Sequence, residues 1–325
     1  MSNISITIAS GDYDRTRPIR DGLVAVDGCD ITYLNMQPPE LFLRAARDAE
    51  FDVTEFSIST YMLQTQRGET QYTAIPVFLS RSFRQSNLYI RTDRGIEEPR
   101  DLKGKLVGVP EYQLTAAVWL RGLLKDEYGL DAWDLRWRTG GVEQPGRQER
   151  TPISLPSEYD YAPIGGDKTL AGALADGEID ALISPPDPSC FRGGAPHVAR
   201  MWPDYRDAEK QYFQRTGVFP VMHLVAVRKS LVEKHPWLPA ALYKAFSEAK
   251  DLALENLHYR TVSVVTLPWV VAEIEATEQF LGKDFWPYGI EPNRDVIEKL
   301  IRYSHQQHLT EPGMTPQDLF PQIIH

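Results

Sequence analysis

The sequence contains little of what several common protein classes require. Among its 325 residues there are only two cysteines, Cys29 and Cys190. Two thiols cannot build a disulfide framework or a four-thiolate zinc site, and we expect both to be free. No His-Glu-x-x-His, Cys-x-x-Cys, Gly-x-Ser-x-Gly or dinucleotide-binding pattern occurs. Zinc proteases, serine hydrolases and Rossmann-type dehydrogenases therefore lose their usual sequence support.

Positive charge and long apolar runs are also scarce. The chain has 35 Lys and Arg against 45 Asp and Glu, a net charge of −10. Such a surface repels nucleic acids and anionic membranes, so we expect neither as a partner. The most apolar late stretch, residues 261–274, is interrupted by Pro268 and is too short to span a bilayer. Residues 1–10 lack the basic and apolar regions of a secretory signal, and we expect a cytoplasmic protein.

What is present has the composition of a globular protein, with 42% hydrophobic and 25% charged residues. The length suggests two units, each large enough to bury a core. Strand-like and helix-like patterns alternate along the first half of the chain. We expect strands at 4–9, 29–36, 51–54 and 106–109, with helices beginning at Pro38 and Pro39, after 55–59, and after 110–113. This alternation predicts an α/β fold with a mostly parallel sheet covered by helices.

The middle of the chain contains one long irregular segment between regular elements. Residues 138–163 are rich in proline, glycine and charge, and are too long for a plain connector, so we interpret them as a lid or an interface. The remaining patterns predict strands at 179–183 and 218–227 and helices at 168–176, 238–257, 268–281 and 294–305.

Three segments resemble landmarks of type II periplasmic-binding-protein folds. They are DLKGKLVGV at 101–109, LADGEIDA at 174–181, and RKSL at 228–231 with the following Pro236 and alanine-rich helix. The resemblance implies a two-lobed α/β fold with interleaved lobes and a ligand cleft at the hinge. Lobe I would comprise 1–83 and 221–325, and lobe II would comprise 84–220.

Three more specific strings resemble the 4,5-dihydroxyphthalate decarboxylase family. They are GDYDRT at 11–16, EYQLTAAVWLRG at 111–122 and GVFPVMH at 217–223. The resemblance implies a cytoplasmic carboxy-lyase of phthalate degradation that acts on a small aromatic carboxylate. We expect a cofactor-independent, non-oxidative conversion of 4,5-dihydroxyphthalate to protocatechuate and carbon dioxide.

Two groups of charged residues are candidates for binding the substrate carboxylates. Asp12, Tyr13, Arg15 and Arg17 follow the first strand, where open α/β sheets bind ligands. Arg81 and Arg84 lie at the expected first crossing between lobes. Arginine binds a carboxylate through paired hydrogen bonds, which suits an aromatic diacid. For the first group, the alternative is a surface loop whose charges pair with one another. For Arg81 and Arg84, the alternative is a solvated hinge.

Further candidates stand where strands give way to helices. Glu55, Ser57 and Ser59 do so in lobe I, and Glu111, Tyr112 and Thr115 do so in lobe II. Free backbone N–H groups at a helix start favour anions, and the hydroxyls could donate to a carboxylate. Simple N-capping is the alternative for each hydroxyl. Ser184, after the strand at 179–183, is a similar candidate at the cleft edge.

His223 and Glu111 are the candidates for proton transfer. His223 lies in an apolar strand at the second crossing, and the alternative is a structural core histidine. We expect a closed anionic cleft to raise the pKa of Glu111 so that it carries a proton. Arginines would hold the carboxylate that remains, while an acid protonates the ring carbon that loses carbon dioxide.

Other classes of function stay open at the level of sequence. A non-catalytic binding protein, serving in transport or as a sensor for a small aromatic or anionic ligand, would need affinity but no proton relay. Another enzyme on the same fold is a third reading. Acidic residues are plentiful, so a divalent metal remains an alternative that metal analysis of the active protein decides. A homo-oligomer is compatible with the sequence.

Overall fold

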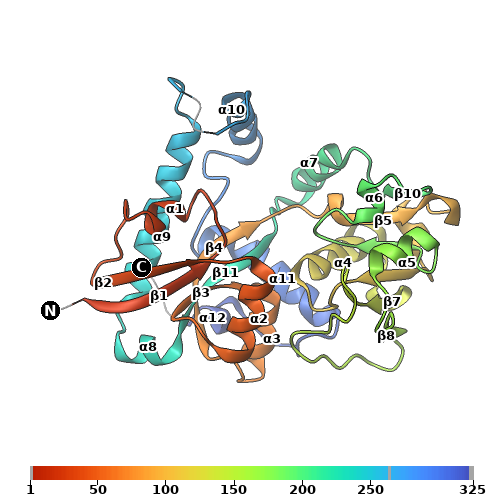
Figure 1. Ribbon diagram of the computed structural model, residues 1–325, viewed down its shortest axis with the longest axis horizontal. Coiled ribbons are helices and arrows are strands. Elements are labelled where there is room, and N and C mark those ends of the chain that lie inside the picture. Colours follow the sequence, from red (N-terminus) through yellow and green to blue (C-terminus); the bar gives the residue numbers. More distant parts are fainter. Residues whose placement is uncertain (1–2, 263–264, 322–325) are drawn as a thin grey trace.

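The computed structural model describes residues 3–262 and 265–321 and has two lobes side by side (Figure 1). The first lobe is built on a five-stranded sheet. Its strands, in spatial order, are β2 (Cys29–Asn35), β1 (Ile4–Ser10), β3 (Val53–Ser57), β11 (Val221–Arg228) and β4 (Tyr72–Arg81). The second lobe contains a six-stranded sheet in the order β10 (Val198–Arg200), β5 (Leu88–Arg91), β9 (Ala181–Ile183), β6 (Leu106–Val109), β7 (Arg136–Thr139) and β8 (Tyr161–Pro163).

Helices cover both sheets. In chain order they are α1 (Arg17–Arg20), α2 (Pro38–Asp48), α3 (Ile58–Gln66), α4 (Thr115–Tyr128), α5 (Leu170–Asp176), α6 (Ser189–Arg192), α7 (Tyr205–Thr216), α8 (Lys229–Lys234), α9 (Leu238–Leu257), α10 (Val270–Leu281), α11 (Arg294–Gln306) and α12 (Pro316–Leu319). The paired prolines begin α2, where a missing N–H costs nothing. Gly177 ends α5 with a φ of 73°, a conformation that favours glycine.

Both sheets are mixed, although the sequence predicted mostly parallel strands. Strand β1 is parallel to β2 and β3, whereas β11 is antiparallel to both β3 and β4. Strand β5 is likewise antiparallel to β9. Strand β11 joins the first sheet after the whole second sheet has been completed, so the chain returns to the first lobe. The lobe boundaries at 83/84 and 220/221 stay predictions.

The predicted elements agree with the structure in type, and their ends differ by a few residues. The third strand runs to Ser57 instead of ending at Thr54, so Glu55 lies within β3. Strand β8 lies within the segment 138–163, which was predicted to be irregular. The other elements without a sequence prediction are strands β4, β5, β7 and β10 and helices α1, α6, α7, α8 and α12. Of the apolar stretch at 261–274, residues 263–264 lie outside the described residues, and α10 begins only at Val270.

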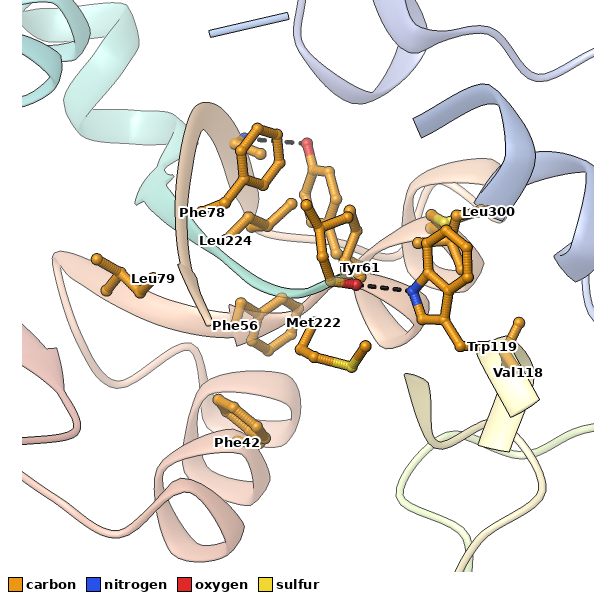
Figure 2. Close-up of a cluster of buried hydrophobic side chains, with 14 of the residues drawn as sticks. Phe42, Phe56, Tyr61, Phe78, Leu79, Val118, Trp119, Met222, Leu224 and Leu300 are labelled. Atoms are coloured by element: carbon orange, nitrogen blue, oxygen red, sulfur yellow. Dashed lines mark hydrogen bonds between the residues drawn. The ribbon is translucent and has the colours of Figure 1, made fainter. Parts of the chain in front are cut away.

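Among the described residues, a large hydrophobic cluster extends through both lobes, and a smaller one lies within the second lobe. Figure 2 shows Trp119 of α4 beside the cluster of Phe56, Tyr61 and Met222. The Trp119 indole N–H donates to the Val221 carbonyl over 2.8 Å. Helix α11 packs on α4 as well, because Gly122 leaves room for the ring of Tyr303. The lobes are therefore held together by packing as well as by the chain crossings.

Candidate active site

A pocket of about 590 Å³ lies between the lobes, where β3 and β11 face the start of α4 and the segment after β7. Its walls are more apolar than polar and include Phe42, Leu114, Val142 and Met222. Eight polar residues line it from both lobes: Ser57, Arg84, Thr115, Glu143, Gln144, Arg147, Arg150 and His223. An apolar pocket with a few converging polar groups is the usual form of a small-molecule site.

The first-lobe wall carries an acid–histidine pair. Strands β3 and β11 are neighbours, and their register brings Glu55 and His223 together. The Nδ1 atom of His223 lies 2.6 Å from Oε1 of Glu55. The Glu55 carboxylate is buried, whereas the His223 side chain is 19% exposed and lines the pocket. Since Nδ1 is engaged, Nε2 is the ring nitrogen that remains available to a ligand.

Glu55 is held as an anion. Burial raises its pKa, but hydrogen bonding and charge from His223, the Gly11 N–H and the Tyr13 hydroxyl outweigh that effect and leave the pKa lowered. The Gly11 N–H lies 2.9 Å from Oε2, and the Tyr13 hydroxyl lies 2.9 Å from Oε1. A fixed carboxylate behind Nδ1 orients the imidazole.

The second-lobe wall carries two arginines that share one acid. Arg147 and Arg150 both belong to the irregular segment after β7, and both pair with Glu111. The Glu111 side chain is 1% exposed and also accepts from the Arg150 N–H and from Gln113. Glu111 therefore fixes this segment against the start of α4, with its two guanidinium groups on the pocket wall.

Glu111 does not have the raised pKa that the sequence predicted. Burial does raise it, but the charges and hydrogen bonds of Arg150 and Arg147 outweigh burial, and the pKa of Glu111 is lowered. A carboxyl group in this state is a poor proton donor. The prediction is wrong because no local pattern indicates that two arginines more than 35 residues away pair with Glu111.

Arg84 is the one arginine of the pocket wall that has no carboxylate within ion-pair distance in the described part of the chain. Its Nη1 donates to Asn87 Oδ1 over 2.8 Å, and its Nε lies 3.2 Å from the Met222 sulfur. Burial lowers its pKa to about 10, which still leaves it charged near neutral pH. Glu209 interacts with Arg84 electrostatically but forms no ion pair with it, and burial raises the pKa of Glu209 to about 7. A buried cation without a paired carboxylate favours an anionic ligand.

Hydroxyl groups join the two walls between these charged clusters. Ser57 Oγ lies 3.0 Å from Thr115 Oγ1, which also accepts from the Ser59 N–H. Ser57 is the N-cap residue of α3, as one of the alternatives had it, but its side chain makes no capping hydrogen bond. Ser57 and Thr115 line the pocket, whereas the Ser59 hydroxyl is buried behind it without a hydrogen-bond partner.

Four residues of the predicted carboxylate-binding set make other contacts. Arg17 pairs with Asp12 on the surface, which is the alternative that the sequence left open. Arg15 donates to the Leu79 carbonyl over 2.7 Å. Arg81 is buried against the carbonyls of Phe219 and Pro287 and the side chain of Asn293. Asp12, Arg15, Arg17 and Arg81 do not line the pocket, and their side chains bind other groups of the protein instead.

The other predicted residues lie just outside the pocket wall. Tyr13 contacts Glu55 instead of the cavity. Tyr112 is fully buried, and its ring packs edge-on against Trp137. The Ser184 hydroxyl donates to the Pro186 carbonyl over 2.7 Å, while Pro185 and Pro186 form the wall beside it.

Sequence reasoning missed Arg147, Arg150 and Phe42 as residues of the site. The available signal was the irregular segment 138–163, which was interpreted as functional but whose arginines were not singled out. Phe42 is one of the buried apolar residues of α2, a pattern that by itself indicates core packing. In the structure its ring lies edge-on to His223, with centroids 4.6 Å apart.

Three negative findings apply to residues 3–262 and 265–321. No group of three or more His, Cys, Asp or Glu side chains gathers there as a metal-binding set. Both cysteines in this range are free thiols. No helix within it is long and apolar enough to cross a membrane.

Comparisons with known proteins agree on the architecture. The chain superposes on the SsuA sulfonate-binding protein of Methylobacillus flagellatus with a TM-score of 0.56 at 14% identity, covering 98% of this chain and 92% of that one. The aliphatic sulphonate-binding protein SsuA of Escherichia coli gives a TM-score of 0.53 at 13% identity, with 100% and 98% covered. At these identities the likeness concerns the fold: a two-lobed periplasmic-binding-protein-like fold, as the sequence predicted.

Sequence comparison is more specific, although no family model matches the chain. It is 43% identical over 320 residues to a 4,5-dihydroxyphthalate decarboxylase of Comamonas testosteroni, covering 98% of this chain and 97% of the relative. It is 45% identical over 214 residues to one of Pseudomonas putida, covering 66% and 83%. With this identity along nearly its whole length, the chain belongs to the 4,5-dihydroxyphthalate decarboxylase family.

Proposed function

We propose that the protein removes one carboxylate from 4,5-dihydroxyphthalate as carbon dioxide and releases protocatechuate. The observation that carries this proposal is the pocket itself, where an acid–histidine pair faces a set of arginines across apolar walls. The family membership supports the same reaction, and it does not favour a protein that only binds its ligand. The cytoplasmic location remains a prediction.

The charge of the pocket suits a dianion. Arg84, Arg147 and Arg150 bring three positive charges, and Glu111 compensates one of them. Glu209 interacts with Arg84 but forms no ion pair with it. The positive charge that remains suits the two carboxylates of a dianion. Glu143 also lies on the wall, but its carboxylate is exposed and engaged by Ser189, where solvent screens it. We assign one carboxylate to Arg84 and the other to Arg147 and Arg150.

His223 is the proposed proton donor, and Glu55 is its supporting anion. Protonated His223 transfers a proton from Nε2 to the ring carbon that carries the departing carboxylate. The hydroxyl para to that carbon supplies electron density for the new C–H bond. The C–C bond to the carboxylate then breaks, its electron pair restores the aromatic ring, and carbon dioxide leaves. A positioned acid of this kind contributes roughly 10²- to 10⁴-fold to the rate.

The remaining parts of the pocket fit an aromatic ring and a neutral product. Phe42, Leu114 and Met222 offer apolar contact for the faces of the ring. An apolar wall solvates a carboxylate poorly and carbon dioxide well, so it favours the direction of release. We expect no redox cofactor, because both electrons of the broken bond stay on the ring.

The test is to incubate the purified protein with 4,5-dihydroxyphthalate and to measure carbon dioxide and protocatechuate. We expect both products in equal amounts. Phthalate is the matched control compound, since it has the two carboxylates but no hydroxyl to supply electrons. It should bind and not react. If 4,5-dihydroxyphthalate binds but releases no carbon dioxide, the proposed reaction is wrong.

A further inference from the structure

The phenol of Tyr13 shares an oxygen of Glu55 with His223. Both the Tyr13 hydroxyl and His223 Nδ1 contact Oε1, at 2.9 and 2.6 Å, while Oε2 accepts from the Gly11 N–H. The proton-transfer mechanism uses Glu55 and His223 only. It leaves unexplained why a second donor is directed at the oxygen that supports the imidazole.

The surroundings hold the Tyr13 ring in one place. A side chain at Gly11 would put its Cβ 2.6 Å from Cζ of Tyr13, so glycine is needed for the ring to approach Glu55. The Arg15 guanidinium lies 4.3 Å from the ring centroid of Tyr13 and 4.5 Å from that of Trp286. The same guanidinium donates to the Leu79 carbonyl, which ties it to strand β4. Contacts with Gly11 and Arg15 therefore hold the phenol of Tyr13 in one position.

The chemistry of the phenol makes it a permanent donor. Burial and the Glu55 charge raise the pKa of Tyr13, so the hydroxyl keeps its proton at any pH at which the enzyme works. A hydrogen bond to a carboxylate oxygen draws negative charge from it and weakens its attraction for a neighbouring proton. Tyr13 therefore opposes the electrostatic attraction between Glu55 and His223.

We propose that Tyr13 is a positioning residue, which fixes the Glu55 carboxylate for His223 and limits how strongly that carboxylate retains the imidazolium proton. A donor that binds its proton too tightly transfers it slowly, and one that binds it too weakly is unprotonated at working pH. This inference rests on the proposed function, in which His223 is the proton donor.

Other charged and titratable groups also face the pair. Tyr33 and Arg15 lie on the Tyr13 side, and both interact electrostatically with Tyr13. Arg84, Arg147 and Arg150 share the pocket wall with His223. Their charges are common to the wild-type protein and to a Tyr13 variant, so a difference between those two proteins reports the phenol.

The experiment follows the imidazole of His223 by NMR in histidine-labelled protein without substrate, assigned with His223→Gln. We expect Tyr13→Phe to raise the titration midpoint of His223 by about half a unit to one unit, a three- to tenfold change in proton affinity. Tyr33→Phe is the matched control, because the Tyr33 hydroxyl contacts Ser10 and not Glu55. It should leave the midpoint unchanged.

Kinetics give a second readout that a structural role would not move. We expect Tyr13→Phe to shift the alkaline limb of the kcat profile upward by the same amount and to leave KM nearly unchanged. An unchanged His223 midpoint, or a raised KM with an unshifted limb, would overturn the inference and return Tyr13 to the substrate-binding role that the sequence predicted. Because the titration needs no turnover, it decides the role of Tyr13 even if the proposed reaction fails.

Discussion

The two walls of the pocket are built differently. The first-lobe wall consists of paired strands, and the register of β3 against β11 places Glu55 beside His223. The second-lobe wall consists largely of an irregular segment, which Glu111 holds in place through Arg147 and Arg150. Strand register fixes a side chain to within a fraction of an ångström, whereas ion pairs hold a loop that can also be released. We therefore assign proton transfer to the first-lobe wall, which is rigid, and anion binding largely to the second-lobe wall, which ion pairs hold in place.

The largest effect should come from the rigid wall. We expect His223→Gln to lower kcat by about 10²- to 10⁴-fold and to change the affinity for phthalate by less than about threefold, because the proton donor is lost while the arginines remain. Turnover assays and calorimetric titration measure the two quantities. His258→Gln is the control, since His258 lies on the surface and pairs with Glu278. Equal losses of affinity and kcat would show that proton transfer and anion binding are not assigned to separate walls.

The next effect should come from the anion-binding set. Replacing Arg84 by Gln removes a buried cation that forms no ion pair with any carboxylate of the described residues, although Glu209 interacts with it electrostatically. We expect KM for 4,5-dihydroxyphthalate to rise by about 10- to 100-fold, the value of a charge-assisted hydrogen-bond pair. Arg17→Gln is the matched control. Because Arg17 pairs with Asp12 at the surface, KM should not change, and a rise would restore the predicted role of Arg17.

A smaller effect should follow from Glu111→Gln. The neutral amide cannot hold both guanidinium groups, and we expect the segment after β7 to loosen and KM to rise about five- to tenfold. The fold-decrease in kcat should be smaller than the fold-increase in KM. Steady-state kinetics separate these outcomes. A large fall in kcat at constant KM would mean that Glu111 transfers the proton, as the sequence predicted.

The fold and the strand-based half of the site follow from the sequence more readily than the other half. Apolar strands give regular patterns, so the elements that carry Glu55 and His223 could be expected from local sequence, although β3 extends further than predicted. The pairing of Glu111 with Arg147 and Arg150 depends on tertiary contacts across an aperiodic segment. The charges of Arg15, Arg17 and Arg81 were visible in the sequence, but their partners were not. The residue types indicated carboxylate binding and proton transfer. Which of these residues line the pocket depends on tertiary packing, which local sequence does not predict.

The smallest effect concerns the stability of the segment that holds the arginines. Burial raises the pKa of Glu149 to about 7, and one of its oxygens is buried without a partner. The folded protein therefore binds a proton more tightly there than the unfolded chain. The resulting stability is present below the unfolded pKa and decreases as pH rises through about 7.

We expect Glu149→Gln to remove this dependence and to stabilise the protein at pH 8 by on the order of 1–2 kcal/mol relative to the wild type. Denaturant unfolding of both proteins at pH 5 and pH 8 measures the difference. Asp21→Asn is the control, since Asp21 is exposed and pairs with Arg20 at the surface. An equal gain at both pH values would show that Glu149 does not take up a proton on folding.

The most direct test of the account is a crystal structure of the wild-type protein with bound phthalate, which has both carboxylates but cannot react. We predict one carboxylate on Arg84, the other on Arg147 and Arg150, and a carboxylate-bearing ring carbon next to Nε2 of His223. Two results would contradict the assignment of proton transfer to the first-lobe wall and of anion binding to the arginines. One is phthalate bound against Arg15 or Arg17, and the other is phthalate with only its hydrogen-bearing ring edge facing His223.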